Sequence, residues 1–557
     1  MGKLIIYIIS IKIFLSGGQV ISQSISSTRH NLSISGPGPV TADNEQEICI
    51  FCHTPHNSLP AAPLWNRSSS GQTYILYDNT TSSTFHATAG QPDGSSILCL
   101  SCHDGTIALG NVNSRSTDIT FGTTMTRGNL TTDLSNDHPV SFVFDAGLAI
   151  ADPQLIHPPT SPVTLDENNK LQCTACHDPH KNTFTKFLVT TNENSDLCIK
   201  CHNMTDWSGS SHQVSGKTWT GGGSNPWAHI EIPYSTVQQN ACENCHDPHN
   251  ASGKTRLLKS VSSLFENNCT DCHNGNVAAQ NITADIIKQY SHSGYDYSLH
   301  SPNEPISPGT PHVVCVDCHN PHGVVTGNPL NNIQGIDQNR NTVSSISNEY
   351  ELCFRCHSGP NAFPLAPTPR QLGSNDLIND FEITNISKHP VLSTADGLGR
   401  TLIAPWNQPG IQVKCTDCHA SNNSSAKGPH GSIYPRILKA NYNLAVSTNL
   451  ANHNDATLAA EFALCAQCHN MANVNNLHSG MKQGHFLAYT TCNTCHDPHG
   501  FQGGSTSRNL YLINLSTTAT SPNSSGNQFI QINGDGTGNC NFTCHGKPHT
   551  HSGSQYR

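Results

Sequence analysis

Pairs of cysteines followed at once by histidine recur along this chain of 557 residues and use all 24 of its cysteines. Eleven copies read C-x-x-C-H, and a twelfth, CNFTCH, has one more residue between its cysteines. Two thiols at this spacing can form thioether bonds to the two vinyl groups of a haem, and the adjacent histidine can then bind the iron as proximal ligand. C-x-x-C-H is the attachment signature of c-type haem. The sequence therefore predicts twelve covalent c-type haems.

The predicted thioether cysteines are Cys49 and Cys52, Cys99 and Cys102, Cys173 and Cys176, Cys198 and Cys201, Cys242 and Cys245, Cys269 and Cys272, Cys315 and Cys318, Cys353 and Cys356, Cys415 and Cys418, Cys465 and Cys468, Cys492 and Cys495, and Cys540 and Cys544. The predicted proximal ligands are His53, His103, His177, His202, His246, His273, His319, His357, His419, His469, His496 and His545.

Other uses of cysteine do not explain the histidines. Zinc ribbons contain C-x-x-C pairs, but they do not require histidine after every second cysteine. Histidine accounts for 33 of 557 residues, so chance would place it after a given cysteine about once in seventeen times. A disulfide framework has no use for the histidines and is typical of short secreted chains.

The composition indicates what must position these motifs. Only 35% of the residues are hydrophobic and 6% aromatic, against about 45–50% apolar residues in an ordinary globular domain. The haems must therefore supply most of the core. We expect mostly irregular coil with short helices wrapped around a chain of haems, and an apo-protein that does not fold.

The first residues resemble a secretory signal peptide, predicted as 1–22, with Lys3 before an apolar run that Lys12 interrupts. The run is shorter than the roughly 20 apolar residues of a transmembrane helix. We expect secretion across the inner membrane to the periplasm or the outer surface, with no integral membrane segment after cleavage. Cleavage changes the formal charge from −10 to −12, and haem propionates add further negative charge, so nucleic acid is not an expected partner.

The motifs are arranged in six dihaem repeats. Each repeat has an isolated histidine, then a motif extended to C-x-x-C-H-x-P-H, then a second motif that leucine usually precedes; in the fifth repeat the extension is stretched to CHASNNSSAKGPH. Self-similarity of this kind indicates a modular array. Repeats 1 to 6 are predicted as residues 23–120, 121–208, 209–285, 286–375, 376–472 and 473–557.

The second histidine of H-x-P-H is a candidate sixth ligand. Three residues span at most about 10 Å, and proline stiffens the segment, so His56 cannot reach the far face of the haem that His53 holds. It should therefore bind a different haem. The same argument applies to the equivalent histidines of the later repeats, which are His180, His249, His322, His430 and His499.

One upstream histidine per repeat completes a set of twelve distal ligands. We select His30, His138, His229, His300, His389 and His485. Alternatives stay open in three repeats: His212 could replace His229, His292 or His312 could replace His300, and His478 could replace His485.

The segment from Arg29 to Asn57, the sequences DHPV and KHPV, and the alternation of CxxCHDPH with LCxxCH resemble the doubled-CXXCH-motif multihaem cytochromes. This family includes periplasmic and outer-surface cytochromes of dissimilatory metal-reducing bacteria, some of which polymerise into conductive filaments. The resemblance implies bis-histidine haems of low potential, stacked in a chain, that transfer electrons without substrate chemistry. CNFTCH and the stretched fifth repeat depart from the pattern.

Two functions fit these features. The first is an electron carrier that serves redox partner proteins or extracellular electron acceptors, with self-assembly into a filament or an outer-membrane complex as a further hypothesis. The second is a multihaem reductase of nitrite, hydroxylamine or a sulfur oxyanion. Such reductases need an iron with an open position, often with lysine as proximal ligand. No C-x-x-C-K occurs, and 21 histidines remain after the proximal ones, so the sequence favours the carrier and predicts no catalytic residues.

Overall fold

The computed structural model describes residues 24–555 with gaps at 60–61, 63, 126, 261–266, 293–312, 360–367, 375, 424–425, 445–454, 479–490, 507, 533–536 and 545. The predicted signal segment and three predicted ligands, His300, His485 and His545, lie outside the described residues.

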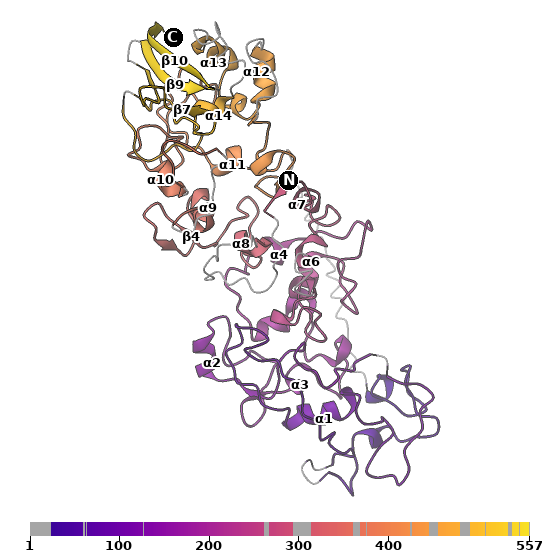
Figure 1. The fold of residues 1–557 in the computed structure, drawn as a ribbon. Coiled ribbons are helices and arrows are strands. Elements are labelled where there is room, and N and C mark those ends of the chain that lie inside the picture. Colours follow the sequence, from indigo (N-terminus) through magenta and orange to yellow (C-terminus); the bar gives the residue numbers. More distant parts are fainter. Residues whose placement is uncertain are drawn as a thin grey trace, which may run out of the picture. The chain divides into compact units, whose positions relative to one another are not determined.

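Short helices joined by long irregular segments make up the described chain (Figure 1). This confirms the prediction of a mostly irregular fold. The helices are α1 (Gly94–His103), α2 (Ala146–Ala151), α3 (Cys173–Cys176), α4 (Ser211–Val214), α5 (Val237–Asn240), α6 (Asn267–Thr270), α7 (Thr283–Ile286), α8 (Cys315–Cys318), α9 (Glu349–His357), α10 (Leu377–Phe381), α11 (Cys415–Cys418), α12 (Asp455–Glu461), α13 (Met471–Leu477) and α14 (Cys492–Cys495). In the described part of the chain, no helix is both long enough and apolar enough to cross a membrane.

The strands are short and pair locally. They are β1 (Phe142–Val143), β2 (Lys170–Leu171), β3 (Tyr290–Ser291), β4 (Gly335–Ile336), β5 (Thr342–Val343), β6 (Gly431–Ser432), β7 (Thr520–Ser521), β8 (Phe529–Ile532), β9 (Thr537–Cys544) and β10 (Lys547–Gln555). The two-stranded pairs β1–β2, β3–β6 and β4–β5 are all antiparallel.

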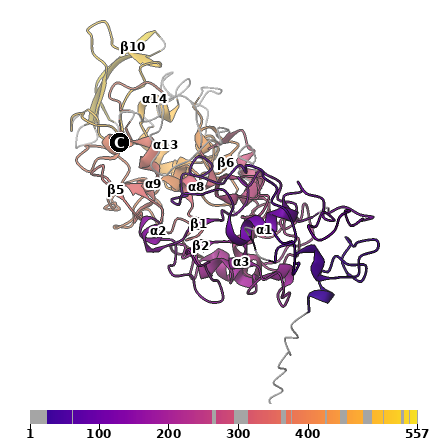
Figure 2. The ribbon, with the colours of Figure 1, turned by 90° about the horizontal axis from the view of Figure 1, so that it is seen from below.

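The chain forms two compact bodies. The first contains residues 1–204, 232–234 and 239–259, and the second contains the remainder. In the first body, α1 and α3 lie side by side in both views (Figures 1 and 2). A small apolar cluster next to them joins the β1–β2 pair to α3; its buried members are Phe142, Phe144, Val163, Leu171 and Ala175.

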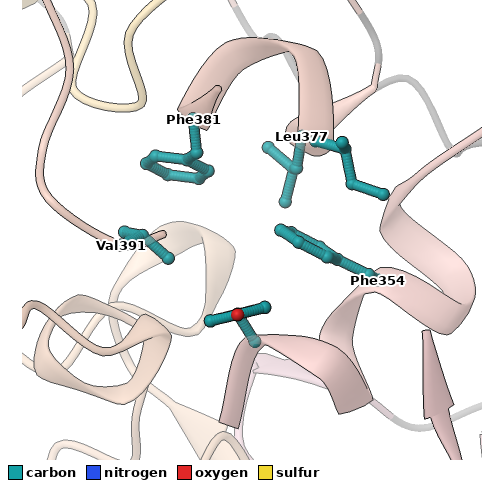
Figure 3. Packing of buried hydrophobic residues seen from close by; sticks show 6 residues of the cluster. Phe354, Leu377, Phe381 and Val391 are labelled. Carbon is teal, nitrogen blue, oxygen red and sulfur yellow. The ribbon is translucent and has the colours of Figure 1, made fainter. Parts of the chain in front are cut away.

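In the second body, α9 and α10 pack against each other through an apolar cluster. Phe354 of α9 is fully buried and faces Leu377 and Phe381 of α10, and Val391 closes the cluster (Figure 3). Because α9 carries the eighth C-x-x-C-H motif at its C-terminal end, this packing fixes the position of one haem-attachment segment.

The C-terminal sheet differs from what the sequence predicts. Strand β9 pairs with β10 on one side and with β7 and β8 on the other; Figure 1 labels β7, β9 and β10. The CNFTCH motif lies on β9, where Cys540, Phe542 and Cys544 alternate onto one buried face. The tail that we expected to be coil is β10, and it folds back at Gly546, whose φ of 72° is in the left-handed region that glycine readily adopts.

Candidate haem centres

Each of the eleven C-x-x-C-H motifs begins in a helix, which is a single turn except in α1 and α9. Where the helix ends with the motif, the backbone N–H of the histidine donates to the carbonyl of the first cysteine, as in His53 to Cys49 (2.8 Å), His177 to Cys173 (3.0 Å) and His496 to Cys492 (2.9 Å). Two residues between the cysteines are what one turn requires to place both thiols on the side from which the histidine projects.

A second hydrogen bond orients the proximal imidazoles. Nδ1 lies 2.8–2.9 Å from the carbonyl oxygen of Lys186 in His177, of Arg256 in His246, of Arg436 in His419 and of Tyr511 in His496. Since a carbonyl can only accept, Nδ1 carries the proton and the lone pair is on Nε2. This is the usual outer-shell arrangement for a metal-binding histidine.

The residues that supply these carbonyls were missed by the sequence analysis. Each has a positive φ, between 56° and 62°, and so does the residue after it, which turns the carbonyl toward the imidazole. The signal in the sequence was a short recurring segment after the first motif of a repeat: TKFL (185–188), TRLL (255–258), PRIL (435–438) and LYLI (510–513).

Imidazole rings face one another in nine pairs. A metal–imidazole bond is about 2.0 Å long and the ring centre lies about 1 Å behind the bonding nitrogen, so two imidazoles on opposite sides of one metal ion have centroids about 6 Å apart. The observed centroid separations are 6.0–6.3 Å, in His30–His103, His53–His180, His138–His202, His177–His249, His212–His273, His292–His357, His319–His430, His419–His499 and His478–His496.

This spacing fits a bis-histidine haem. Every pair contains one histidine of a C-x-x-C-H motif, and in the described part of the chain no three His, Cys, Asp or Glu side chains converge as a metal cluster. The residues would therefore hold iron by two axial nitrogens, with the four equatorial ligands coming from a porphyrin that the motif cysteines fix.

The pairs fall into two classes by the angle between their ring planes. Where the partner is the last histidine of H-x-P-H or of its stretched form, the angle is 15–37°, as in His53–His180 (15°) and His419–His499 (37°). Where the partner is an upstream histidine, the angle is 54–78°, as in His212–His273 (78°). The two kinds of ligand thus give near-parallel and crossed imidazoles.

The repeats share ligands in a way that the sequence analysis did not anticipate. Each repeat offers two distal histidines for two haems, so both could serve the haems of their own repeat. Instead, His180 of repeat 2 faces His53 of repeat 1, and His249 of repeat 3 faces His177 of repeat 2. The short tether explains this shift, because it lets the second histidine of H-x-P-H reach only a haem next to its own. His56, the equivalent histidine of repeat 1, is exposed.

Proline carbonyls also connect neighbouring repeats. The carbonyl oxygen of the proline in H-x-P-H lies close to Nδ1 of the upstream histidine of the preceding repeat: Pro179 to His30 (3.3 Å), Pro321 to His212 (2.7 Å), Pro429 to His292 (3.0 Å) and Pro498 to His389 (2.5 Å). The H-x-P-H segment therefore orients an upstream histidine through its proline carbonyl and provides a distal ligand through its last histidine.

In three repeats the facing ring is that of the alternative upstream histidine. His212 faces His273, which favours it over His229. His292 faces His357, and His478 faces His496, which belongs to the first motif of its repeat. Our first choices in these last two repeats, His300 and His485, lie outside the described residues and stay predictions.

Other predicted ligands lie near the motifs without a described facing pair. His389 is close enough to His469 for its charge to affect the pKa of that ring. His322 has its ring centroid 6.2 Å from that of Trp207. His229 and His246 each interact with other residues of the chain.

Burial favours the neutral form of four of the paired imidazoles. It lowers the pKa of His177, His273 and His496 to about 4 and that of His499 to about 3. A neutral imidazole is the form that binds metal, so the rings are ready to coordinate iron at neutral pH.

Attachment segments of successive repeats touch through their thiols. The first cysteine of a repeat's second motif lies close enough to the first cysteine of the next repeat for its own pKa to be raised by that thiol, in Cys99–Cys173, Cys198–Cys242 and Cys353–Cys415. The vinyl edges of the two haems held there would be close neighbours.

The twelfth motif does not share this geometry. On strand β9, Cys540 and Cys544 are four residues apart in extended chain, which is about 13 Å, and both are buried in the apolar cluster of the sheet. Two thioether bonds to one porphyrin need the compact turn of the other motifs, so attachment of a haem here would require Cys540 and Cys544 to leave the strand conformation.

Two comparisons with known proteins bear on these centres. Residues 166–206 and 305–362 match the family described as "Doubled CXXCH motif". The multiheme cytochrome MtrA of Shewanella baltica (strain OS185) is 27% identical over 214 residues, which are 35% of this chain and 46% of that protein. The chain thus matches less than half of the length of this relative.

Proposed function

We propose that this chain is a multihaem c-type cytochrome like those of metal-reducing bacteria, and that it relays electrons through twelve haems, each held by two histidines. Electron transfer by a multihaem cytochrome is supported by the comparisons; the number of haems, their ligands and the site of action are the proposal. The six repeats with the boundaries given above are the proposed dihaem units.

The observation that carries the proposal is the occupation of both axial positions. In all nine described pairs an imidazole stands on each side of the place where iron would lie. A substrate-reducing haem needs one open coordination position, and these nine offer none. We therefore propose a carrier and not an enzyme; a reductase of nitrite, hydroxylamine or a sulfur oxyanion is the alternative that the test must exclude.

The H-x-P-H segments connect the haems between which electrons would move. Residues 177–180 join the pair that contains His180 to the pair that contains His177, and residues 496–499 join the pairs of His499 and His496 in the same way. Three residues of chain span at most about 10 Å, so the two histidines would hold their irons close together. Electrons can therefore hop between the haems attached at the first motifs of successive repeats. The haem attached at a second motif would connect to this path where its cysteine approaches the first motif of the next repeat.

We propose the periplasm or the outer surface as the place of action, since haem attachment takes place after export and residues 1–22 have the features of a secretory signal. Partners would be redox proteins or extracellular electron acceptors. Assembly of copies into a filament or an outer-membrane complex stays a prediction from the sequence.

Reoxidation of the fully reduced, purified protein tests this function. We expect a soluble ferric chelate to reoxidise all of the haems rapidly in a stopped-flow experiment. Nitrite, hydroxylamine and sulfite should support no sustained turnover with a reductant in excess. Catalytic turnover of any of these three would contradict the carrier and establish the reductase.

The count of haems is tested separately by intact mass. Twelve haem increments over the chain without its signal support the full proposal. Eleven would mean that β9 keeps its strand conformation and that CNFTCH is not an attachment site.

A further inference from the structure

Arg67 is a buried cation with no anion beside it. The residue has no exposed surface. Its guanidinium donates to the carbonyl oxygens of Ser101 (3.0 and 3.3 Å), Leu109 (2.7 Å) and Ala108 (3.0 Å), and among the described residues no carboxylate lies within ion-pair distance of it. Buried charges are normally paired. Here three backbone dipoles compensate the charge locally without neutralising it.

The cation is held between the two attachment segments of repeat 1. Its neighbour Asn66 donates from the backbone to the carbonyl of Cys52 (2.9 Å) and from Nδ2 to that of Ile50 (2.5 Å), which are both in the first motif. Ser101, which accepts from Arg67, is in the second motif. Residues 66 and 67 therefore clamp one motif to the other and place a fixed positive charge beside both.

The two sides of the clamp differ in charge. Asp104 directly follows His103, the proximal histidine of the second motif, and it is buried. The first motif, from Cys49 to His53, contains no acidic residue, and none follows it directly. The positive charge of Arg67 is thus offset by Asp104 at the second motif and is not offset within the first.

Resting on the proposed electron relay, we propose that Arg67 raises the reduction potential of the haem attached at Cys49 and Cys52, so that an electron on repeat 1 resides preferentially on that haem. Reduction adds one negative charge to a haem, and a nearby fixed cation stabilises the reduced form. Arg370 differs from Arg67 in its charge environment: it also donates to backbone carbonyls beside a motif, but Asp497 lies 3.7 Å from it.

The test isolates one haem among many. In a His180→Ala background the haem at Cys49 loses its distal ligand, and its high-spin signal can be titrated separately against electrode potential. At an effective dielectric constant of about 20, a unit charge roughly 10–15 Å away changes a one-electron equilibrium about tenfold, which is about 59 mV. Arg67→Gln should lower the potential by about this amount, and Arg67→Lys, which keeps the charge, should leave it nearly unchanged.

Arg115→Met is the matched control, because Arg115 is in the same repeat but exposed and paired with Glu45; it should have little effect. Equal shifts for Arg67→Gln and Arg67→Lys, or no shift for either, would overturn the proposal and leave Arg67 as a structural clamp. A second measurement needs no change at Arg67. The potential in His180→Ala should exceed that of the haem at Cys99 exposed by His30→Ala, and the reverse order would also overturn it. If neither variant produces high-spin iron, the proposed ligands are wrong and not the role of Arg67.

Discussion

Replacing His180 by alanine should convert the haem attached at Cys49, and not the one attached at Cys173, to high spin. His180 follows the proximal ligand His177 by three residues, but its ring faces His53 with centroids 6.0 Å apart and planes 15° apart. The haem that loses its ligand keeps its thioether bonds and its proximal histidine. We therefore expect the number of haems to stay the same while one iron per chain becomes five-coordinate.

The size of the effect follows from the pairs. Four described pairs have near-parallel rings, and up to three further haems have ligands that are not described as pairs. Loss of one near-parallel pair should lower the low-temperature electron paramagnetic resonance signal of that class by between a seventh and a quarter, and should add high-spin signal equal to one iron. Added imidazole should restore the low-spin signal.

Two companion variants complete the assay. His86 is exposed and outside every pair, so His86→Ala should leave the spectrum unchanged. Removing the first haem with Cys49→Ser and Cys52→Ser in the His180→Ala background should abolish the high-spin signal. High-spin iron that persists in this triple variant would place the vacated position on another haem and refute the tether reasoning.

Three further outcomes are expected. His212→Ala should generate one high-spin haem and His229→Ala should not, as judged by the same spectroscopy; the opposite result would restore the choice made from the sequence. Burial raises the pKa of Asp380 to about 8 from an ordinary value near 4, so the folded state binds a proton that the unfolded chain has released between those values, and stability should fall as pH rises from about 4 to 8. Asp380→Asn should flatten this dependence in denaturant titrations, and an unchanged slope would show that another group is responsible. Changing Cys540 and Cys544 to serine should reduce the intact mass by one haem, whereas an unchanged number of haems would mean that the motif on β9 carries none.

The sequence predicted what is local and repeated. Because one helical turn suffices to present C-x-x-C-H, the motifs could be identified without any knowledge of the fold. The partners of the proximal histidines could not, because the pairing of His53 with His180 depends on how repeat 2 packs against repeat 1. The same holds for His212 against His229, where spacing alone offers no preference and the carbonyl of Pro321 selects the ring.

The CNFTCH motif shows that the residues of an attachment motif do not by themselves determine its conformation. CNFTCH contains the residues for attachment, but its alternating pattern also suits a strand, and Gly546 allows the following segment to fold back as β10. Competition between the two conformations depends on contacts with β7 and β8, which no local pattern reveals. The carbonyl-donating turns after the first motifs were missed for a different reason: their recurrence is visible in the sequence, but their role depends on positive φ values.

Low-temperature electron paramagnetic resonance of the fully oxidised, purified protein tests the central claim most directly, namely that two histidines hold each haem of an electron relay. The account predicts only low-spin ferric iron, in two populations that correspond to near-parallel and crossed imidazoles. A high-spin signal equal to one or more irons per chain in the unaltered protein would contradict it, because that iron would have an open position for a substrate.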